Sequence, residues 1–90
     1  MLSIVPSNKF KKDLKLAIKR GYNIKLLDDV VSKIAAQEKL DEKYKDHALS
    51  GEYNDFRECH ITPDWLLVYQ IIENELILFL SRTGTHSDLF

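Results

Sequence analysis

The chain has 90 residues, enough for one domain with a single hydrophobic core but too few for a core and a separate regulatory module. Its composition, 44% hydrophobic and 30% charged, is typical of a soluble globular protein. No apolar run approaches the ~20 residues that a membrane span requires. The N-terminal charges follow the apolar part, the reverse of a signal peptide, and the single cysteine, Cys59, cannot form an internal disulfide. We therefore expect a cytoplasmic protein without membrane association.

Charge is distributed unevenly along the chain. Residues 1–25 contain seven basic residues and one acid, whereas residues 26–90 contain six basic residues and thirteen acids. One side or end of the folded domain should therefore be basic. Such a surface suits a polyanionic partner, although a lysine-rich helix face is also a common solvated surface.

The N-terminal segment predicts a strand followed by a helix. Residues 1–5 are short and apolar, and Pro6 closes them, as at the end of a strand. Ser7 is a suitable N-cap for a helix over residues 8–20, where apolar residues recur at helical spacing between lysines. Gly21 ends this helix.

A second helix is predicted immediately afterwards. Asn23 is its N-cap, and the apolar stripe runs to about Gln37, so the two helices should form an αα-hairpin. Residues 38–50 are polar with isolated apolar positions. They predict an extended connection with room for one helical turn, ending at Gly51.

The C-terminal half predicts three strands. Residues 53–61 alternate like a half-buried strand, residues 65–72 are almost continuously apolar, and residues 75–82 form the last strand. The short turns at residues 62–64 and 73–74 make the three an antiparallel meander. The order of elements predicts an α+β fold of one domain, 1–90, with the helices on one face of the sheet.

All three histidines lie in this C-terminal half. If the meander pairs as predicted, His60 and Asp64 flank one tight turn, and Arg82 lies near the end of the adjacent strand at the same edge. His86 follows four residues later. His47, taken alone, reads as an exposed loop histidine. Together these residues could bring imidazole, carboxylate and guanidinium groups to one edge of the sheet.

Metal, serine-hydrolase and phosphate-loop chemistry are disfavoured. His60 and Asp64 do not have a standard ligand spacing, and Cys59 should point to the opposite face of its strand from His60. The sequence has no nucleophile elbow and no phosphate-binding glycine loop. We therefore expect no metal and no cofactor.

The remaining possibility is acid/base chemistry on a substrate that supplies its own nucleophile. RNA cleavage by the ribose 2′-hydroxyl is such a reaction, because it needs a base, an acid and a cation for the phosphorane charge. Histidine suits the first two roles and arginine the third. Trp65, Tyr69 and Phe90 could stack bases, although core packing is the more common role of residues such as Trp65 and Tyr69.

Three segments of this half resemble a known family. YKDHAL (44–49), FRECHITPDWLLVY (56–69) and RTGTHSDLF (82–90) are similar to the YafQ branch of the RelE/ParE toxin superfamily, in the same order and with similar spacing. Each motif alone is weak, but their joint occurrence is specific. The helical half agrees in pattern only.

The resemblance implies a type II toxin that cleaves mRNA in the ribosomal A site, is held inactive by a co-expressed antitoxin, and has a compact RelE-like α+β fold. The family's functional residues, carried over by position, are His47, His60, Asp64, Trp65, Arg82, His86 and Phe90. In this scheme His86 is the general acid, Asp64 with either His47 or His60 forms the base side, Arg82 neutralises the phosphorane, and Trp65 and Phe90 hold bases.

The basic first helix is a further candidate surface, for RNA or for an acidic antitoxin tail. Its candidate contacts are Lys9, Lys11, Lys12 and Lys15. Two alternatives to a ribonuclease stay open. One is a catalytically weak relative that acts by binding its antitoxin in a transcription-repressing complex. The other is a gyrase-poisoning relative, which the filled histidine positions disfavour.

Overall fold

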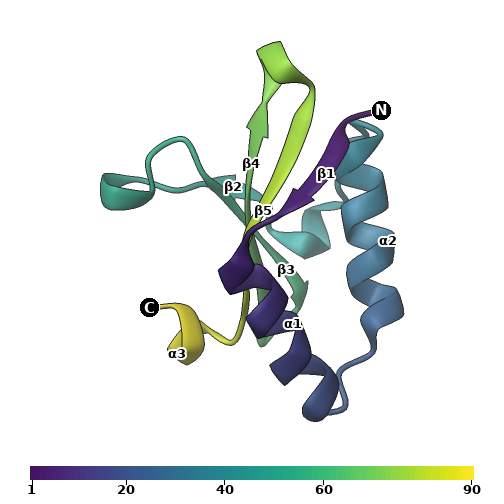
Figure 1. The fold of residues 1–90 in the computed structure, drawn as a ribbon, viewed down its shortest axis with the longest axis vertical. Coiled ribbons are helices and arrows are strands. Elements are labelled where there is room, and N and C mark those ends of the chain that lie inside the picture. Colours follow the sequence, from purple (N-terminus) through teal and green to yellow (C-terminus); the bar gives the residue numbers. More distant parts are fainter.

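A computed structural model describes all of residues 1–90. The chain folds as an α+β domain, as predicted (Figure 1). The strands and α-helices are β1 (Ser3–Pro6), α1 (Asn8–Lys19), α2 (Ile24–Ala35), β2 (His47–Ala48), β3 (Arg57–Thr62), β4 (Trp65–Ile72), β5 (Ile77–Gly84) and α3 (His86–Leu89). Short 3₁₀ turns are η1 (Glu42–Tyr44), η2 (Gly51–Tyr53) and η3 (Glu73–Glu75). None of the helices has the length and hydrophobicity that a membrane span needs.

The strands form one five-stranded sheet in the order β1-β5-β4-β3-β2. The antiparallel meander β3-β4-β5 is confirmed, and β1 pairs with β5 in parallel. The prediction for residues 38–50 was incomplete. The connection contains η1 as its helical turn, but it also contributes β2, which pairs with β3 at the sheet edge. A two-residue strand is too short to show an alternating pattern in sequence.

Both predicted helix caps are present. The Ser7 hydroxyl accepts a hydrogen bond from the Phe10 N–H at 2.9 Å, and the Asn23 side chain accepts one from the Lys25 N–H at 3.1 Å. Each side chain satisfies an N–H group that has no partner within its helix. The two caps therefore set where α1 and α2 begin.

Three other boundaries differ from the predictions, each beside a residue with positive φ. Gln37 has φ 61°, and α2 ends before it; Asp55 has φ 79°, and β3 begins after it; Leu76 has φ 54°, and β5 begins after it. None of the three is glycine, so the sequence carried no obvious signal for the left-handed conformation.

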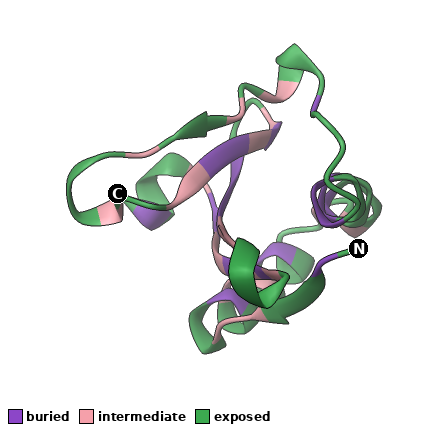
Figure 2. Ribbon diagram, turned by 90° about the horizontal axis from the view of Figure 1, so that it is seen from above, coloured by how far each residue is buried: buried purple, intermediate pink, exposed green.

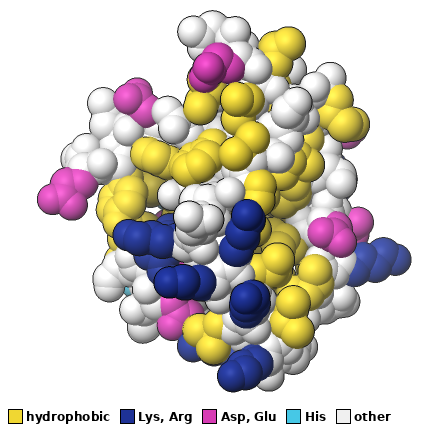
Figure 3. All heavy atoms as spheres, viewed as in Figure 1, with side chains coloured by type: hydrophobic (Ala, Val, Ile, Leu, Met, Phe, Trp, Pro, Cys, Tyr) yellow, Lys and Arg dark blue, Asp and Glu magenta, His cyan; other side chains and the backbone are white.

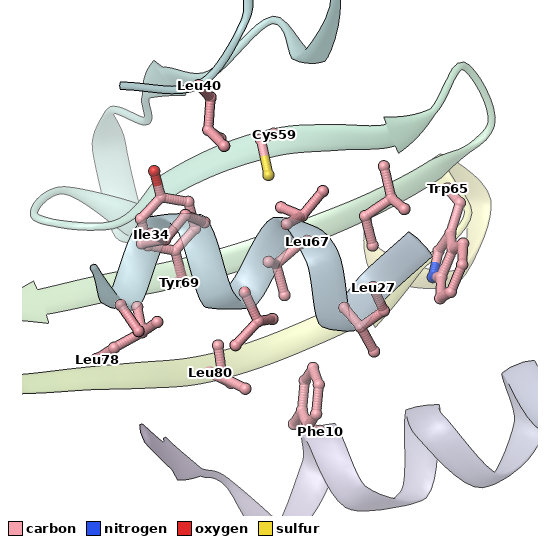
Figure 4. Packing of buried hydrophobic residues seen from close by; sticks show 14 of the residues in the cluster. Phe10, Leu27, Ile34, Leu40, Cys59, Trp65, Leu67, Tyr69, Leu78 and Leu80 are labelled. Atoms are coloured by element: carbon pink, nitrogen blue, oxygen red, sulfur yellow. The ribbon is translucent and has the colours of Figure 1, made fainter. Parts of the chain in front are cut away.

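The main core lies between the sheet and the two long helices, which cover one face (Figures 1 and 4). Strand side chains such as Cys59, Leu67 and Leu78 are fully buried there. In Figure 2 buried residues concentrate in the central strands and on α2, whereas the marginal loops are exposed.

A smaller cluster covers part of the opposite face of the sheet. There Leu66 and Val68 of β4 pack with Leu89 of α3, and Phe56 and Leu49 adjoin them. β4 is therefore buried on both faces, which explains why its sequence is apolar without alternation.

Candidate active site

A pocket of about 510 Å³ lies where β3 turns into β4 and where the chain leaves β5. Three of the predicted residues line it: His60, Asp64 and His86. We call it the histidine pocket; its other lining residues are Tyr22, Pro63, Leu66, Thr85 and Ser87. Two imidazoles and a carboxylate thus share one solvent-accessible space.

The β3–β4 turn positions the first two groups. His60 pairs with Leu66 across the strands, and a register shift follows between His60 and Thr62. The His60 Nδ1 atom lies 3.3 Å from the Pro63 carbonyl oxygen, a contact that orients the ring. Asp64 occupies the turn immediately before β4 and is exposed.

The helix α3, which was not predicted from the sequence, positions His86. Thr85 and Asp88 form a capping box: the Asp88 N–H donates to the Thr85 hydroxyl at 3.2 Å, and the Thr85 N–H donates to the Asp88 carboxylate at 2.9 Å. Gly84 makes room for this box, because its φ is 155° and a Cβ there would lie 3.0 Å from Asp88 Oδ2.

An ion pair joins α3 to the segment that follows α1. The Arg20 guanidinium donates to both carboxylate oxygens of Asp88, at 2.7 and 3.3 Å. Arg20, together with the Thr85 N–H, lowers the pKa of Asp88 well below its ordinary range. This pair was not predicted from the sequence, because its partners are 68 positions apart.

The last two residues fix the end of the chain against the sheet. Leu89 is buried in the smaller cluster, whereas Phe90 is 50% exposed. The Phe90 ring centroid lies 5.2 Å from that of His86 and 5.5 Å from that of Tyr53. Phe90 is therefore beside the histidine pocket with part of its ring accessible.

Arg82 does not join the other three residues in the histidine pocket, contrary to the predicted convergence. Its Nε donates to Asp13 Oδ2 at 2.7 Å and its Nη2 to Asp13 Oδ1 at 3.1 Å. These bonds raise the pKa of Arg82. Asp13, in α1, also accepts the Thr83 N–H at 3.1 Å. Asp13 was not among the predicted site residues, although it is the sole acid among residues 1–25.

His47 also lies outside the pocket, and it is in β2 rather than in a loop. Its Nδ1 donates to the Lys45 carbonyl at 2.7 Å, because a carbonyl oxygen can only accept. Its Nε2 lies 3.5 Å from Glu58 Oε1. Cross-strand pairing places His47, Glu58, Val68 and Arg82 in one row across the sheet.

The proposed base-stacking role of Trp65 does not fit its position. Trp65 is only 3% exposed and belongs to the main core. Its indole N–H donates to the Thr83 hydroxyl at 2.8 Å, and its ring lies 5.0 Å from that of Tyr22. Trp65 is therefore a packing residue behind the site. Tyr69 is likewise 2% exposed.

The predicted lysines of α1 are all exposed: Lys9, Lys11, Lys12 and Lys15. None of them forms an ion pair. Figure 3 shows basic side chains gathered over α1, next to hydrophobic ones. Leu16 and Ile18 of the same helix are 42% and 57% exposed, so this face combines positive charge with apolar surface.

The donor set offers no obvious metal centre. No group of three or more His, Cys, Asp or Glu side chains is arranged to hold a metal ion. Cys59 is fully buried, and burial raises its pKa to about 12, so it is neither a ready ligand nor a nucleophile.

Comparison with known proteins agrees with this architecture. Residues 2–90 match the family described as "Bacterial toxin of type II toxin-antitoxin system, YafQ". The mRNA interferase toxin YafQ of Escherichia coli K12 is 36% identical over 85 residues, 93% of this chain and 90% of that protein.

Solved structures give the same result. A metal-bound toxin from Helicobacter pylori is 56% identical, with a TM-score of 0.95 and complete coverage of both chains. YafQ in the E. coli DinJ–YafQ toxin–antitoxin complex is 36% identical, with a TM-score of 0.89, covering 99% of this chain and 97% of that one.

The sheet order and the helix pair give this chain the α+β fold of solved toxin structures such as that of YafQ from E. coli BL21(DE3). Within that class, this chain belongs to the YafQ family of type II toxin–antitoxin toxins.

The Asp88 ion pair makes the docking of α3 sensitive to acid. Folding lowers the pKa of Asp88, so its ionised carboxylate stabilises the folded state. This contribution is complete above the pKa of the unfolded chain, about 4, and is lost progressively as the pH falls below that value. Amide NMR from pH 6 to pH 2 should show local unfolding of residues 85–90 at a higher pH than unfolding of β4. In the Asp88→Asn variant, α3 should be locally unfolded already at pH 6. Equal acid sensitivity of α3 in wild type and in this variant would contradict this account.

Proposed function

We propose that this protein is an endoribonuclease toxin that cleaves mRNA by metal-independent acid/base chemistry in the histidine pocket. The observation that carries the proposal is the shared lining of one pocket by His60, Asp64 and His86. The substrate class is supported by the 36% identical relatives named mRNA interferase toxin. The ribosomal A site is the proposed place of cleavage.

In the proposed reaction the ribose 2′-oxygen attacks the adjacent phosphorus. A base takes the 2′-hydroxyl proton, the bond to the 5′-oxygen breaks, and an acid protonates that leaving oxygen. The products are a 2′,3′-cyclic phosphate and a 5′-hydroxyl. His60 and Asp64, which flank the β3–β4 turn, form the base side. His86, at the start of α3, lines the same pocket and is the acid.

Arg82 is proposed to stabilise the phosphorane charge from outside the pocket. Asp13 binds Nε and Nη2 of its guanidinium, so Nη1 is left without a protein partner. A fixed guanidinium can donate to a phosphate oxygen without first losing conformational freedom. Phe90, half exposed beside His86, is the proposed base-packing residue.

A cognate antitoxin is the proposed partner. The E. coli relative at 36% identity has been solved in complex with DinJ as a toxin–antitoxin pair. The exposed face of α1 is a suitable anchor here, because it presents unpaired lysines beside Leu16 and Ile18. An acidic segment with apolar residues would complement both features.

The assignment of the acid is tested by His86→Gln. Glutamine keeps a polar side chain but cannot deliver a proton, so single-turnover cleavage of ribosome-bound mRNA should fall by ~10² to 10⁴. Antitoxin binding and thermal unfolding should stay unchanged. His60→Gln should lower the rate comparably, and His47→Gln less, because His47 lies outside the pocket. A near wild-type rate for His86→Gln would refute the assignment and make His60 or His47 the acid to test.

Metal independence has its own test. Protein stripped with EDTA and returned to the magnesium that ribosomes require should cleave at the original rate. The RNA ends should be 2′,3′-cyclic phosphate or 3′-phosphate, because the nucleophile is the ribose itself. A water activated by metal would typically leave a 3′-hydroxyl. Recovery of activity only after zinc or copper is added, or 3′-hydroxyl ends, would overturn the mechanism.

The antitoxin anchor is tested by charge reversal on α1. Lys11→Glu, Lys12→Glu and Lys15→Glu together should weaken the complex strongly at low salt and little at high salt, because surface charges are screened. The matched control is reversal of Lys25, Lys33 and Lys39, which changes net charge equally outside α1. Calorimetry at two salt concentrations measures the antitoxin affinity of both triple variants. If the two variants lose the same amount of affinity, the effect is one of general charge and α1 is not the anchor.

A further inference from the structure

A second groove adjoins the β3–β4 turn and shares two lining residues with the histidine pocket. It has a volume of about 420 Å³, and its lining includes Lys43, Tyr44, Lys45 and Leu26. His60 and Pro63 line both this groove, which we call the lysine groove, and the histidine pocket. The two spaces are therefore adjacent at His60 and Pro63.

The two lysines have no carboxylate within ion-pair distance. Lys43 Nζ lies 5.2 Å from the Tyr44 ring centroid, and Lys45 also lines a neighbouring pocket that contains Asp41, Glu42 and Asp46. The neighbouring Asp46 is occupied, because Arg57 donates to it at 3.0 Å and the Tyr69 hydroxyl also donates to it. These lysines are therefore available cations in the half of the chain where acids predominate.

The backbone that carries them is held in place. The Asp41 side chain accepts the Lys43 N–H at 3.0 Å, and the Lys45 N–H donates to the Glu42 carbonyl at 3.0 Å. Lys45 has φ 49°, in the left-handed region, and its carbonyl accepts the His47 ring N–H at 2.7 Å. The hydrogen bonds on both sides of Lys45 maintain a conformation that residues other than glycine rarely adopt.

Apolar surface accompanies the charge. Leu26 is 39% exposed although it belongs to α2, and Tyr44 is partly exposed with its ring against the main core. A ribose or base can pack on such surface while its phosphate meets the lysines. Cationic and apolar groups in one groove are the combination that single-stranded nucleic acid requires.

We propose that the lysine groove binds single-stranded RNA beside the cleaved step, with Lys43 and Lys45 contacting a flanking phosphate. This inference rests on the proposed function, because it takes the histidine pocket as the place of cleavage. The shared wall at His60 and Pro63 favours RNA over the antitoxin as occupant, since the substrate chain must continue beyond the pocket.

The first test measures binding of an oligoribonucleotide whose reacting ribose is 2′-O-methylated, so that it cannot be cleaved. Lys43→Gln with Lys45→Gln should lower affinity several-fold at low salt and reduce the slope of log K against log salt by about 1.4, because each lysine that neutralises the RNA backbone contributes ~0.7 to that slope. The control, Lys25→Gln with Lys39→Gln, removes two lysines elsewhere and should change the slope little. Equal slopes for wild type and the groove variant would overturn the inference.

The second test locates the phosphate. Single neutral methylphosphonates are placed on either side of the reacting step. One position should weaken binding to wild type but not to the Lys43→Gln, Lys45→Gln variant, because both changes remove the same interaction. If the effects of methylphosphonate and lysine substitution on binding free energy are additive at every position, these lysines contact no particular phosphate. The groove would then not be a subsite.

Two outcomes separate this inference from the proposed function. If wild-type protein neither binds nor cleaves RNA, the proposed function fails and the inference fails with it. If wild type cleaves and the groove variant keeps the same half-saturating RNA concentration, only the inference fails. Loss of antitoxin binding in the groove variant with unchanged RNA binding would identify an antitoxin surface and also overturn it. Thermal unfolding of each variant checks that it is folded.

Discussion

Burial of both faces of β4 is the constraint on which the arrangement of the site depends. One face packs on α1 and α2, and the other exposes Leu66 and Val68 unless something covers them. Leu89 covers them, which requires the chain to fold back after β5. That return brings His86 to the pocket that His60 lines. Hydrophobic burial at the end of the chain thus supplies the second imidazole of the site.

Two carboxylates connect the helical half of the chain to the half that carries the histidines. Asp13 in α1 binds Arg82 and the Thr83 N–H, and Asp88 in α3 binds Arg20 beyond α1. Both carboxylates also accept backbone N–H groups, so each orients a segment as well as a cation. Charge-assisted bonds of this kind are short and directional. α1 is therefore part of the support of the site as well as a basic surface.

Two spaces adjoin the β3–β4 turn. They are the histidine pocket and the lysine groove, and His60 and Pro63 line both. The first contains two imidazoles and a carboxylate, and the second contains two lysines. In the proposed function, a nucleic acid crossing this turn meets the acid/base groups and the lysines in succession, and this local positive charge does not depend on the net charge of −1 of the whole chain.

The sequence by itself determined the features that depend on neighbours along the chain. Helical spacing and the caps Ser7 and Asn23 defined α1 and α2, and alternation with short turns defined the meander. The turn that separates His60 from Asp64 is short, so the sequence was enough to predict that both lie at the same edge of the sheet. These signals arise within a few residues, where backbone geometry repeats at a fixed period.

Only the tertiary structure decided the rest. Asp13 and Arg82 are 69 positions apart, and no local pattern relates them. Trp65 carries a motif position yet is buried, because the helices cover its face of the sheet. His47 joined a strand too short to leave a pattern, outside the histidine pocket. Which groups face each other depends on how helices and sheet pack, and packing is a property of the whole chain.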